Sequence, residues 1–535
     1  MNKIKIDYIP EPKIEFGDDI LCDDPKMGLQ LGGFFSTNEN SHKSEIHLGI
    51  IGTKQNVQDF QDWIGRFSQK IEAKVIENII EQTVEISDGV IEELHEDNNL
   101  TSTLNLGTLF ENSSDGLPKH SIEEHEQRTQ NKKFNPDFPG YTSDGVFKSK
   151  FLVDSSNIQY FKGKDITELI TNKKNTNINK LEEAIAIIEE AYNRILEYKI
   201  TDIDVCIIII PDAVYDKLNS VSFGKSHINF RRKLKALLIS KQNSIPVQIV
   251  LESTIKGTKK SMQDLSMQAW NFVVANYYKS GCIPWTLNLQ EKDSCFIGIS
   301  FHKLINGENN LMRASVAQAF NYEGKGIVFI GKPFEWNSKK TKTSAPHLEH
   351  NYAYNMIKNV IDTYIKINNN KKPNRIVIHK TTDFWTSNDN QEYAEVEGLE
   401  YGIKELLGDD IEIDFVTITN SKIRLYRQVG IYPVPRGTLL EIDDKEGVLY
   451  TTGYIPYYEL YPGMATPRPL HIKVIGESTL RQISTEILAL SKMNFNNCNY
   501  YDSLPITIRF AQRVGEIVQY FPDGVIPPNK YYYYM

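Results

Sequence analysis

Apolar residues in the first half of the chain follow two alternating patterns. Unbroken apolar runs, typical of strands buried on both faces, lie at 47–52, 204–210 and 247–251. Apolar residues at helical spacing lie at 59–80, 181–198, 229–240 and 262–279. Strands that alternate with helices predict a mostly parallel sheet with helices on its faces.

The second half begins with strands and then alternates. Strands are predicted at 295–301, 311–320, 326–334, 375–380 and 411–418. Helices are predicted at 349–367, 392–406, 478–491 and 505–520. Three antiparallel strands followed by alternating helix and strand is the order of an RNase H sheet.

Two segments do not fit either pattern. Residues 91–135 are polar, acidic and rich in Asn, Ser and His, which predicts a long loop or flexible insertion. The tail Tyr531–Tyr534 is compatible with a packed or a disordered C-terminus. The expected fold is therefore α/β, with one domain over 1–290 that contains the insertion and a second over 291–535.

Length and charge bound the function. A chain of 535 residues suggests about two to four domains with ample core. Its net charge of -9 gives no global positive field. Binding to nucleic acid would therefore require a local basic groove.

Cysteine usage and the absence of long apolar segments favour a reducing cytoplasm with no membrane association. The five cysteines show no CxxC or Cys/His spacing, which argues against a disulfide framework and a zinc site. They are Cys22, Cys206, Cys282, Cys295 and Cys498. The first residues lack the apolar core of a signal peptide, and the apolar run at 205–210 is too short to span a bilayer.

The RNase H pattern lacks its acids. Such a site needs carboxylates that converge on two divalent metals. Ser300 stands where the first strand should present Asp, and Thr381 stands just after the second strand. A hydroxyl is a much weaker ligand than a carboxylate for a hard metal ion. Asp383 offers an alternative register, but a shift of two residues moves a side chain about 7 Å along a strand.

A second group of residues could bind phosphate. Arg231 and Lys235 are four apart on a predicted helix and share a face. Gln248 follows on the next strand, and Lys279 ends the next helix. Cations and an amide that converge near helix ends would make a phosphate site. The alternative is a solvated helix face.

The order of these motifs resembles that of a short prokaryotic Argonaute with MID and PIWI domains, nearly from end to end. The matching stretches include Glu11–Gly17, Asp24–Leu29, Phe138–Gly140, Ile297–Ser300, Ile376–Lys380, Arg436–Thr438, Leu449–Gly453, Ser491–Asn497 and Leu504–Ala511. The resemblance implies a Rossmann-like MID domain followed by an RNase H-like PIWI domain.

The resemblance also implies roles for particular residues. Arg231, Lys235, Gln248 and Lys279 match the pocket for the 5′ end of a guide, although the family often has an aromatic residue or His at the first position. In relatives the C-terminal carboxylate, here that of Met535, and a Mg²⁺ ion join this pocket.

Three further cations are candidates for contacts with the nucleic-acid backbone. Lys492, Arg509 and Arg513 could contact guide or target phosphates; solvent-facing helix charge is the alternative. His379 and Lys380 match a family position, where a hydrogen-bonded histidine at the end of a strand is equally compatible.

The implied function is guide-directed recognition without cleavage. The guide is expected to be a small 5′-phosphorylated RNA and the target single-stranded DNA, with base pairing supplying sequence choice. The resemblance implies a partner effector with an Argonaute-associated domain, sirtuin-like or TIR and less often a nuclease, that depletes NAD in defence against plasmids or phage. An active guide-dependent endonuclease and a structural scaffold for a partner protein are the alternatives.

Overall fold

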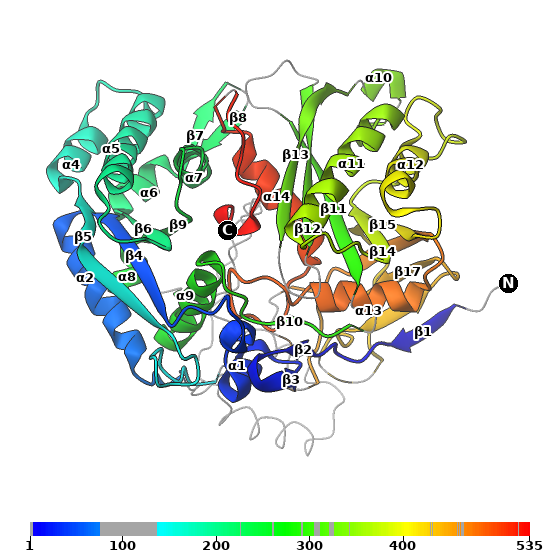
Figure 1. Cartoon of the computed structure of the whole chain (residues 1–535), viewed down its shortest axis with the longest axis horizontal. Helices are drawn as coiled ribbons and strands as arrows, with labels where there is room; N and C mark the ends of the chain where they lie inside the picture. Colours follow the sequence, from blue (N-terminus) through cyan, green and yellow to red (C-terminus); the bar gives the residue numbers. More distant parts are fainter. Residues whose placement is uncertain are drawn as a thin grey trace, which may run out of the picture.

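The protein consists of two α/β lobes that face each other, with the C-terminus between them (Figure 1). This computed structural model describes residues 4–74 and 136–535, apart from 225, 259–261, 290–292, 304–310, 320–325, 337, 342, 429, 431, 457, 460, 462–464 and 523. The predicted insertion at 91–135 lies outside the described residues.

The first lobe is built on a four-stranded parallel sheet in the order β5-β4-β6-β9. These strands are β4 (Glu45–Gly52), β5 (Lys150–Tyr160), β6 (Val205–Ile210) and β9 (Val247–Leu251). The predicted parallel sheet is therefore confirmed.

Helices cover both faces of this sheet, which explains the unbroken apolar strands. One face packs against α2 (Lys54–Gly65) and α9 (Leu265–Lys279), and the other against α5 (Asn177–Tyr198) and α7 (Phe230–Ile239). Two shorter helices join the second face, namely α4 (Gly163–Thr171) and α6 (Asp212–Leu218). Along β6, Ile207 belongs to the first core cluster and Ile208 to the second.

The second lobe contains a nine-stranded sheet in the order β1-β16-β17-β18-β15-β14-β11-β12-β13. Its strands are β1 (Lys5–Tyr8), β11 (Ser294–Lys303), β12 (Leu311–Ala319), β13 (Ile327–Glu335), β14 (Arg375–Lys380), β15 (Glu412–Asn420), β16 (Thr438–Glu441), β17 (Glu446–Leu449) and β18 (Leu470–Ile475). Antiparallel pairing of β11, β12 and β13, with β14 parallel to β11 and β15 parallel to β14, confirms the predicted RNase H order.

Two pairs of helices sandwich this sheet. α11 (His350–Ile367) and α12 (Glu395–Leu407) pack on one face. α13 (Leu480–Leu490) and α14 (Ile506–Val518) pack on the other, and their core is continuous with that of the first lobe. The lobes therefore share buried apolar surface.

The other elements of the described chain are short. A three-stranded sheet contains β2 (Ile14–Glu15), β3 (Leu21–Cys22) and β10 (Thr286–Leu287). The remaining elements are η1 (Gly17–Asp19), α1 (Pro25–Gly32), η2 (Phe35–Asn38), η3 (Arg66–Ser68), the hairpin β7 (Ser220–Phe223) and β8 (Ser226–Asn229), α8 (Glu252–Lys256), α10 (Ser338–Thr341) and η5 (Tyr531–Tyr533).

Two sequence predictions need correction. The helix expected over 59–80 is α2, which begins at Lys54 and ends at Gly65, where a 3-10 turn follows. The first residues do not stay with the first lobe, because β1 pairs antiparallel with β16 at the edge of the nine-stranded sheet. Neither β1 nor β16 has enough residues for a clear alternating pattern.

The C-terminal tail is packed. Tyr531 stacks on Phe510 of α14, and Tyr534 and Met535 are buried. The Tyr533 hydroxyl donates to the Ser244 carbonyl, 3.1 Å away, just before β9. The chain therefore ends beside the strand that carries Gln248. Within the described ranges, no helix is long and apolar enough to cross a membrane.

Candidate nucleic-acid interface

The first two candidate cations lie on α7. Asn229 caps this helix by accepting a hydrogen bond from the Arg232 amide, 3.0 Å away. The cap fixes the first turn, so Arg231 and Lys235 lie one turn apart on the same face. Only 9% of Lys235 is exposed, which is low for a lysine.

Lys279 and Gln248 meet as expected. Lys279 is the last residue of α9, and its ammonium group donates to the Gln248 side-chain oxygen on β9, 2.7 Å away. Lys279 is 1% exposed. The amide oxygen is a neutral acceptor, so this bond positions the lysine without neutralising its charge.

A third cation reaches this cluster from the other lobe. α14 docks on α7 through an Arg232–Glu516 ion pair of 2.8 Å. Just after α14, the Tyr520 hydroxyl accepts a hydrogen bond of 3.0 Å from the backbone N–H of Asn229. Arg513 on α14 then lies close enough to lower the pKa of both Lys235 and Lys279.

We call Arg231, Lys235, Lys279 and Arg513 the cation cluster. Burial lowers the pKa of Lys279 to about 7, and Arg513 adds to the effect. Burial also lowers the pKa of Lys235 well below its usual value, followed by repulsion from the other three cations. In the described structure, the charged groups that act on these two lysines are all cations, which leaves a strong local preference for an anion.

Arg231 contacts a tyrosine of a neighbouring helix. Burial lowers its pKa, while a hydrogen bond with Tyr215 of α6 raises it. Tyr215 is a residue that sequence reasoning missed, because nothing in the sequence brings α6 next to α7.

The donors around the cluster do not favour a divalent metal ion. Mg²⁺ prefers carboxylate and other oxygen ligands. The described residues include no group of three His, Cys, Asp or Glu side chains that could hold a metal. Glu516, the carboxylate that reaches α7, is paired with Arg232 and lies 3.5 Å from Arg513. Mg²⁺ bound through Met535 stays a prediction.

Ser300 lies in β11, and Thr381 directly follows the last residue of β14, the neighbouring strand. The parallel register of β11 and β14 pairs Ile299 with Lys380, so the next positions are Ser300 and Thr381. Ser300 is buried and Thr381 is partly exposed. This is the adjacency that a pair of metal-binding acids would need, and hydroxyls occupy both positions.

Other carboxylates nearby are directed elsewhere. Asp383 is exposed and lies 3.6 Å from Lys473 on β18. Asp502, which lies between the last two helices, accepts hydrogen bonds from Arg509 and from Asn494, the latter 2.9 Å away. A change of register in β14 therefore does not supply the missing acid.

The residues before Thr381 are structural. The buried ammonium group of Lys380 pairs with Glu395 of α12, and that carboxylate also bonds His347, 3.1 Å away. On the opposite face, His379 shares a hydrogen bond of 2.8 Å with Thr507. Burial lowers the pKa of His379 to about 3, with a smaller effect from Arg375, so this histidine is neutral.

The three candidate backbone contacts have different surroundings. Lys492 is fully buried and pairs with Glu11 at 2.7 Å, so it could reach a phosphate only if that pair separated. Arg509 is partly exposed but bonded to Asp502. Arg513 joins the cation cluster instead of lying on a separate surface.

Sequence reasoning also missed an exposed basic loop after β15. The segment Lys422–Arg427 interleaves Lys422, Arg424 and Arg427 with apolar residues, and Tyr426 is 80% exposed. The Arg427 guanidinium lies over the Tyr454 ring, 5.5 Å from its centre. Alternating cations and aromatic rings suit phosphates and unstacked bases, and this alternation was visible in the sequence.

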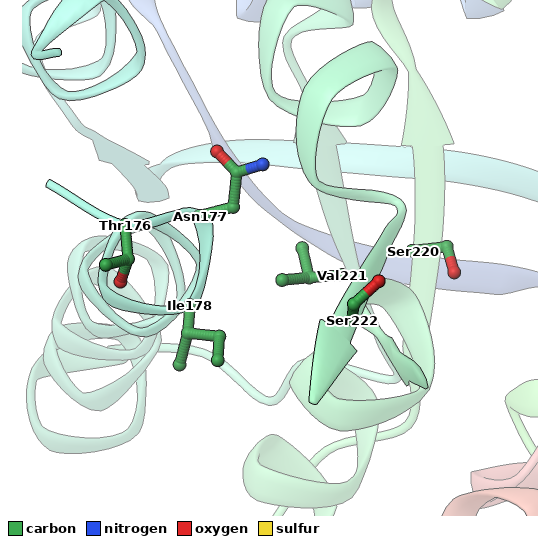
Figure 2. A pocket seen from close by; sticks show the side chains of 6 residues that line it. All are labelled: Thr176, Asn177, Ile178, Ser220, Val221 and Ser222. Carbon is green, nitrogen blue, oxygen red and sulfur yellow. The ribbon is translucent and has the colours of Figure 1, made fainter. Parts of the chain in front are cut away.

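A separate pocket of about 250 Å³ lies between the start of α5 and β7 in the first lobe (Figure 2). It is lined by Thr176, Asn177 and Ile178 at the start of α5 and by Ser220, Val221 and Ser222 of β7. It contains none of the predicted site residues and no charged side chain.

Comparison with protein families identifies a Piwi domain over residues 231–522. This match covers more than half of the chain and includes the cation cluster, Ser300 and Thr381. No curated protein has a sequence that matches significantly.

Similar solved structures are Argonautes. Clostridium butyricum Argonaute, bound to a guide DNA and a target DNA, matches with a TM-score of 0.59 and 17% identity, over 98% of this chain and 54% of that one. Aa-Ago with externally bound siRNA matches with a TM-score of 0.52 and 14% identity, over 99% of this chain and 56% of that one. A. aeolicus Argonaute matches with a TM-score of 0.50 and 15% identity, over 97% of this chain and 54% of that one. The chain thus spans about half the length of these structures.

Proposed function

The chain belongs to the Piwi domain family, and we propose that it recognises nucleic acid through a bound guide and does not cut it. The guide is a small 5′-phosphorylated RNA, and the target is a complementary, single-stranded DNA. The cation cluster carries this proposal, because it gathers buried cationic side chains beside the Gln248 amide, and in the described structure the charged groups that act on Lys235 and Lys279 are all cations.

The guide–target duplex would be held mainly through its backbone. Clostridium butyricum Argonaute, with the same fold, is bound to a guide DNA and a target DNA. The exposed loop Lys422–Arg427 offers backbone contacts in the second lobe, and base pairing supplies sequence choice. Contacts of this kind make binding weaken as salt concentration rises.

The proposed absence of cleavage is supported by the hydroxyls of Ser300, which lies in β11, and Thr381, which follows β14. A protein that recognises a target without cleaving it needs a partner that acts on the recognition. In this proposal a partner effector chain, sirtuin-like or TIR, depletes NAD once target binding shifts a two-state element, as defence against plasmids or phage.

Guide binding is tested first. Nucleic acid is extracted from the purified protein and end-labelled with and without prior phosphatase treatment. We expect short RNAs of uniform length with 5′ phosphates, and their loss in the double variant Lys235→Met plus Lys279→Met. Lys256→Met is the matched control, because Lys256 is an exposed lysine of the same lobe paired with Glu252. Equal RNA in all three proteins, or none in any, would favour a structural scaffold.

Cleavage is tested with the same protein loaded with a 5′-phosphorylated guide. A labelled complementary strand is added with Mg²⁺ or Mn²⁺. We expect an intact target and a stable complex on a native gel. A product cut at a fixed distance from the guide 5′ end would establish the endonuclease alternative and overturn the inactive assignment.

A further inference from the structure

The cation cluster is a composite of both lobes. Arg231 and Lys235 come from α7, Lys279 from the end of α9, and Arg513 from α14. The docking of α14 on α7 is fixed by the Arg232–Glu516 ion pair and the Asn229–Tyr520 hydrogen bond. The position of Arg513 therefore depends on contacts between the lobes rather than on the local sequence.

The positive charge of this cluster is mostly not neutralised by carboxylates of the described residues. Lys279 bonds a neutral amide oxygen at 2.7 Å, and Arg231 bonds the Tyr215 hydroxyl rather than a carboxylate. Arg513 approaches Glu516 only at 3.5 Å, and that carboxylate lies closer to Arg232. Most of the charge stays available to a bound anion.

A divalent cation fits poorly beside these side chains. Mg²⁺ would have to approach four cationic groups, and a phosphate that these groups already neutralise gives it less to bind. The Arg513 guanidinium offers a planar fork of donors suited to two phosphate oxygens.

We propose that the pocket holds the 5′ phosphate of the guide without a divalent metal ion, and that Arg513 from the second lobe supplies the positive charge that Mg²⁺ would otherwise provide. This inference rests on the proposed guide binding. It makes the intact arrangement of the two lobes a condition for binding the 5′ end.

The test compares the affinities of guide RNAs with a 5′ phosphate and with a 5′ hydroxyl. Both are measured by fluorescence anisotropy on the full chain freed of nucleic acid, in excess Mg²⁺ and in EDTA. We expect the same preference for the phosphate in both buffers. Arg513→Met should reduce that preference about tenfold or more in both, because a charge-assisted hydrogen bond is lost.

Controls separate a lost contact from a lost fold. Arg194→Met removes an arginine of α5 that pairs with Glu190 and should leave the preference unchanged. Arg513→Lys keeps the charge without the fork and should fall between wild type and Arg513→Met. If Arg513→Met melts at a lower temperature than wild type, the phosphate preference of Arg513→Lys decides whether Arg513 binds the phosphate.

Two outcomes contradict different claims. A phosphate preference that disappears in EDTA and returns with Mg²⁺ overturns the metal-free inference and leaves guide binding intact. No phosphate preference in either buffer removes the proposed function as well. A preference that Arg513→Met and Arg513→Lys both leave unchanged shows that Arg513 is not a ligand, which also overturns the inference.

Discussion

Replacing Lys279 by methionine should stabilise the unliganded protein near neutral pH while weakening guide binding. Burial and the nearby Arg513 lower the pKa of Lys279 from 10.5 to about 7. At about 1.4 kcal/mol per pKa unit, keeping this side chain charged costs the folded protein about 5 kcal/mol. Methionine removes that cost but leaves the Gln248 oxygen without its donor, which costs about 1–3 kcal/mol. The net gain is of order 2–4 kcal/mol.

The sign of the pH dependence follows from proton binding. Between about pH 7 and 10.5 the unfolded state carries a proton on Lys279 that the folded state lacks. The free energy of unfolding of the wild type therefore rises with pH across that window. The advantage of Lys279→Met is largest below about pH 7 and fades as pH approaches 10.5.

The assay is urea denaturation of wild type and variant, both freed of nucleic acid, at a series of pH values. The readout is the difference in the free energy of unfolding between the two proteins at each pH, because Lys235 and buried tyrosines titrate in both proteins. A variant that is less stable than wild type by the same amount at every pH would refute the reasoning, since Lys279 would then be an ordinary structural lysine.

Two other substitutions test the second lobe. Lys380→Met leaves the Glu395 carboxylate buried without its cation and should cost about 3–5 kcal/mol, whereas Lys404→Met breaks a partly exposed pair and should cost less than about 1 kcal/mol; equal melting temperatures would contradict the burial argument. Gly298→Ala places a methyl group against the Thr507 carbonyl, so α14 must shift and the melting temperature should fall by several degrees. An unchanged melting temperature for Gly298→Ala would mean that α14 packs less tightly on β11.

The contrast between Arg513 and Lys492 shows where sequence reasoning stops. The sequence groups both as candidate contacts with the nucleic-acid backbone, because Lys492 lies in a matching motif and Arg513 lies on the last predicted helix, four residues after Arg509. Arg513 lies with the guide pocket because α14 docks on α7. Lys492 is buried against Glu11, which is far away in the sequence. Pairings between distant segments cannot be inferred from one sequence without contact information.

The sequence by itself determined the two α/β units, three of the four strands of the first sheet, five of the nine strands of the second and the residue types at the candidate sites. Apolar periodicity fixes helices and strands because each must bury one face or both. The hydroxyls at Ser300 and Thr381 are likewise a property of the sequence, and only their adjacency comes from the sheet register.

Only the tertiary structure decided which charges are available to a ligand. Lys235 and Lys279 are buried beside other cations, whereas Lys380 is equally buried but paired with Glu395. The sequence shows the same residue type in all three places. The difference arises because burial removes water and leaves the nearest charge to determine the state of each lysine, and that neighbour is chosen by the packing of helices and strands.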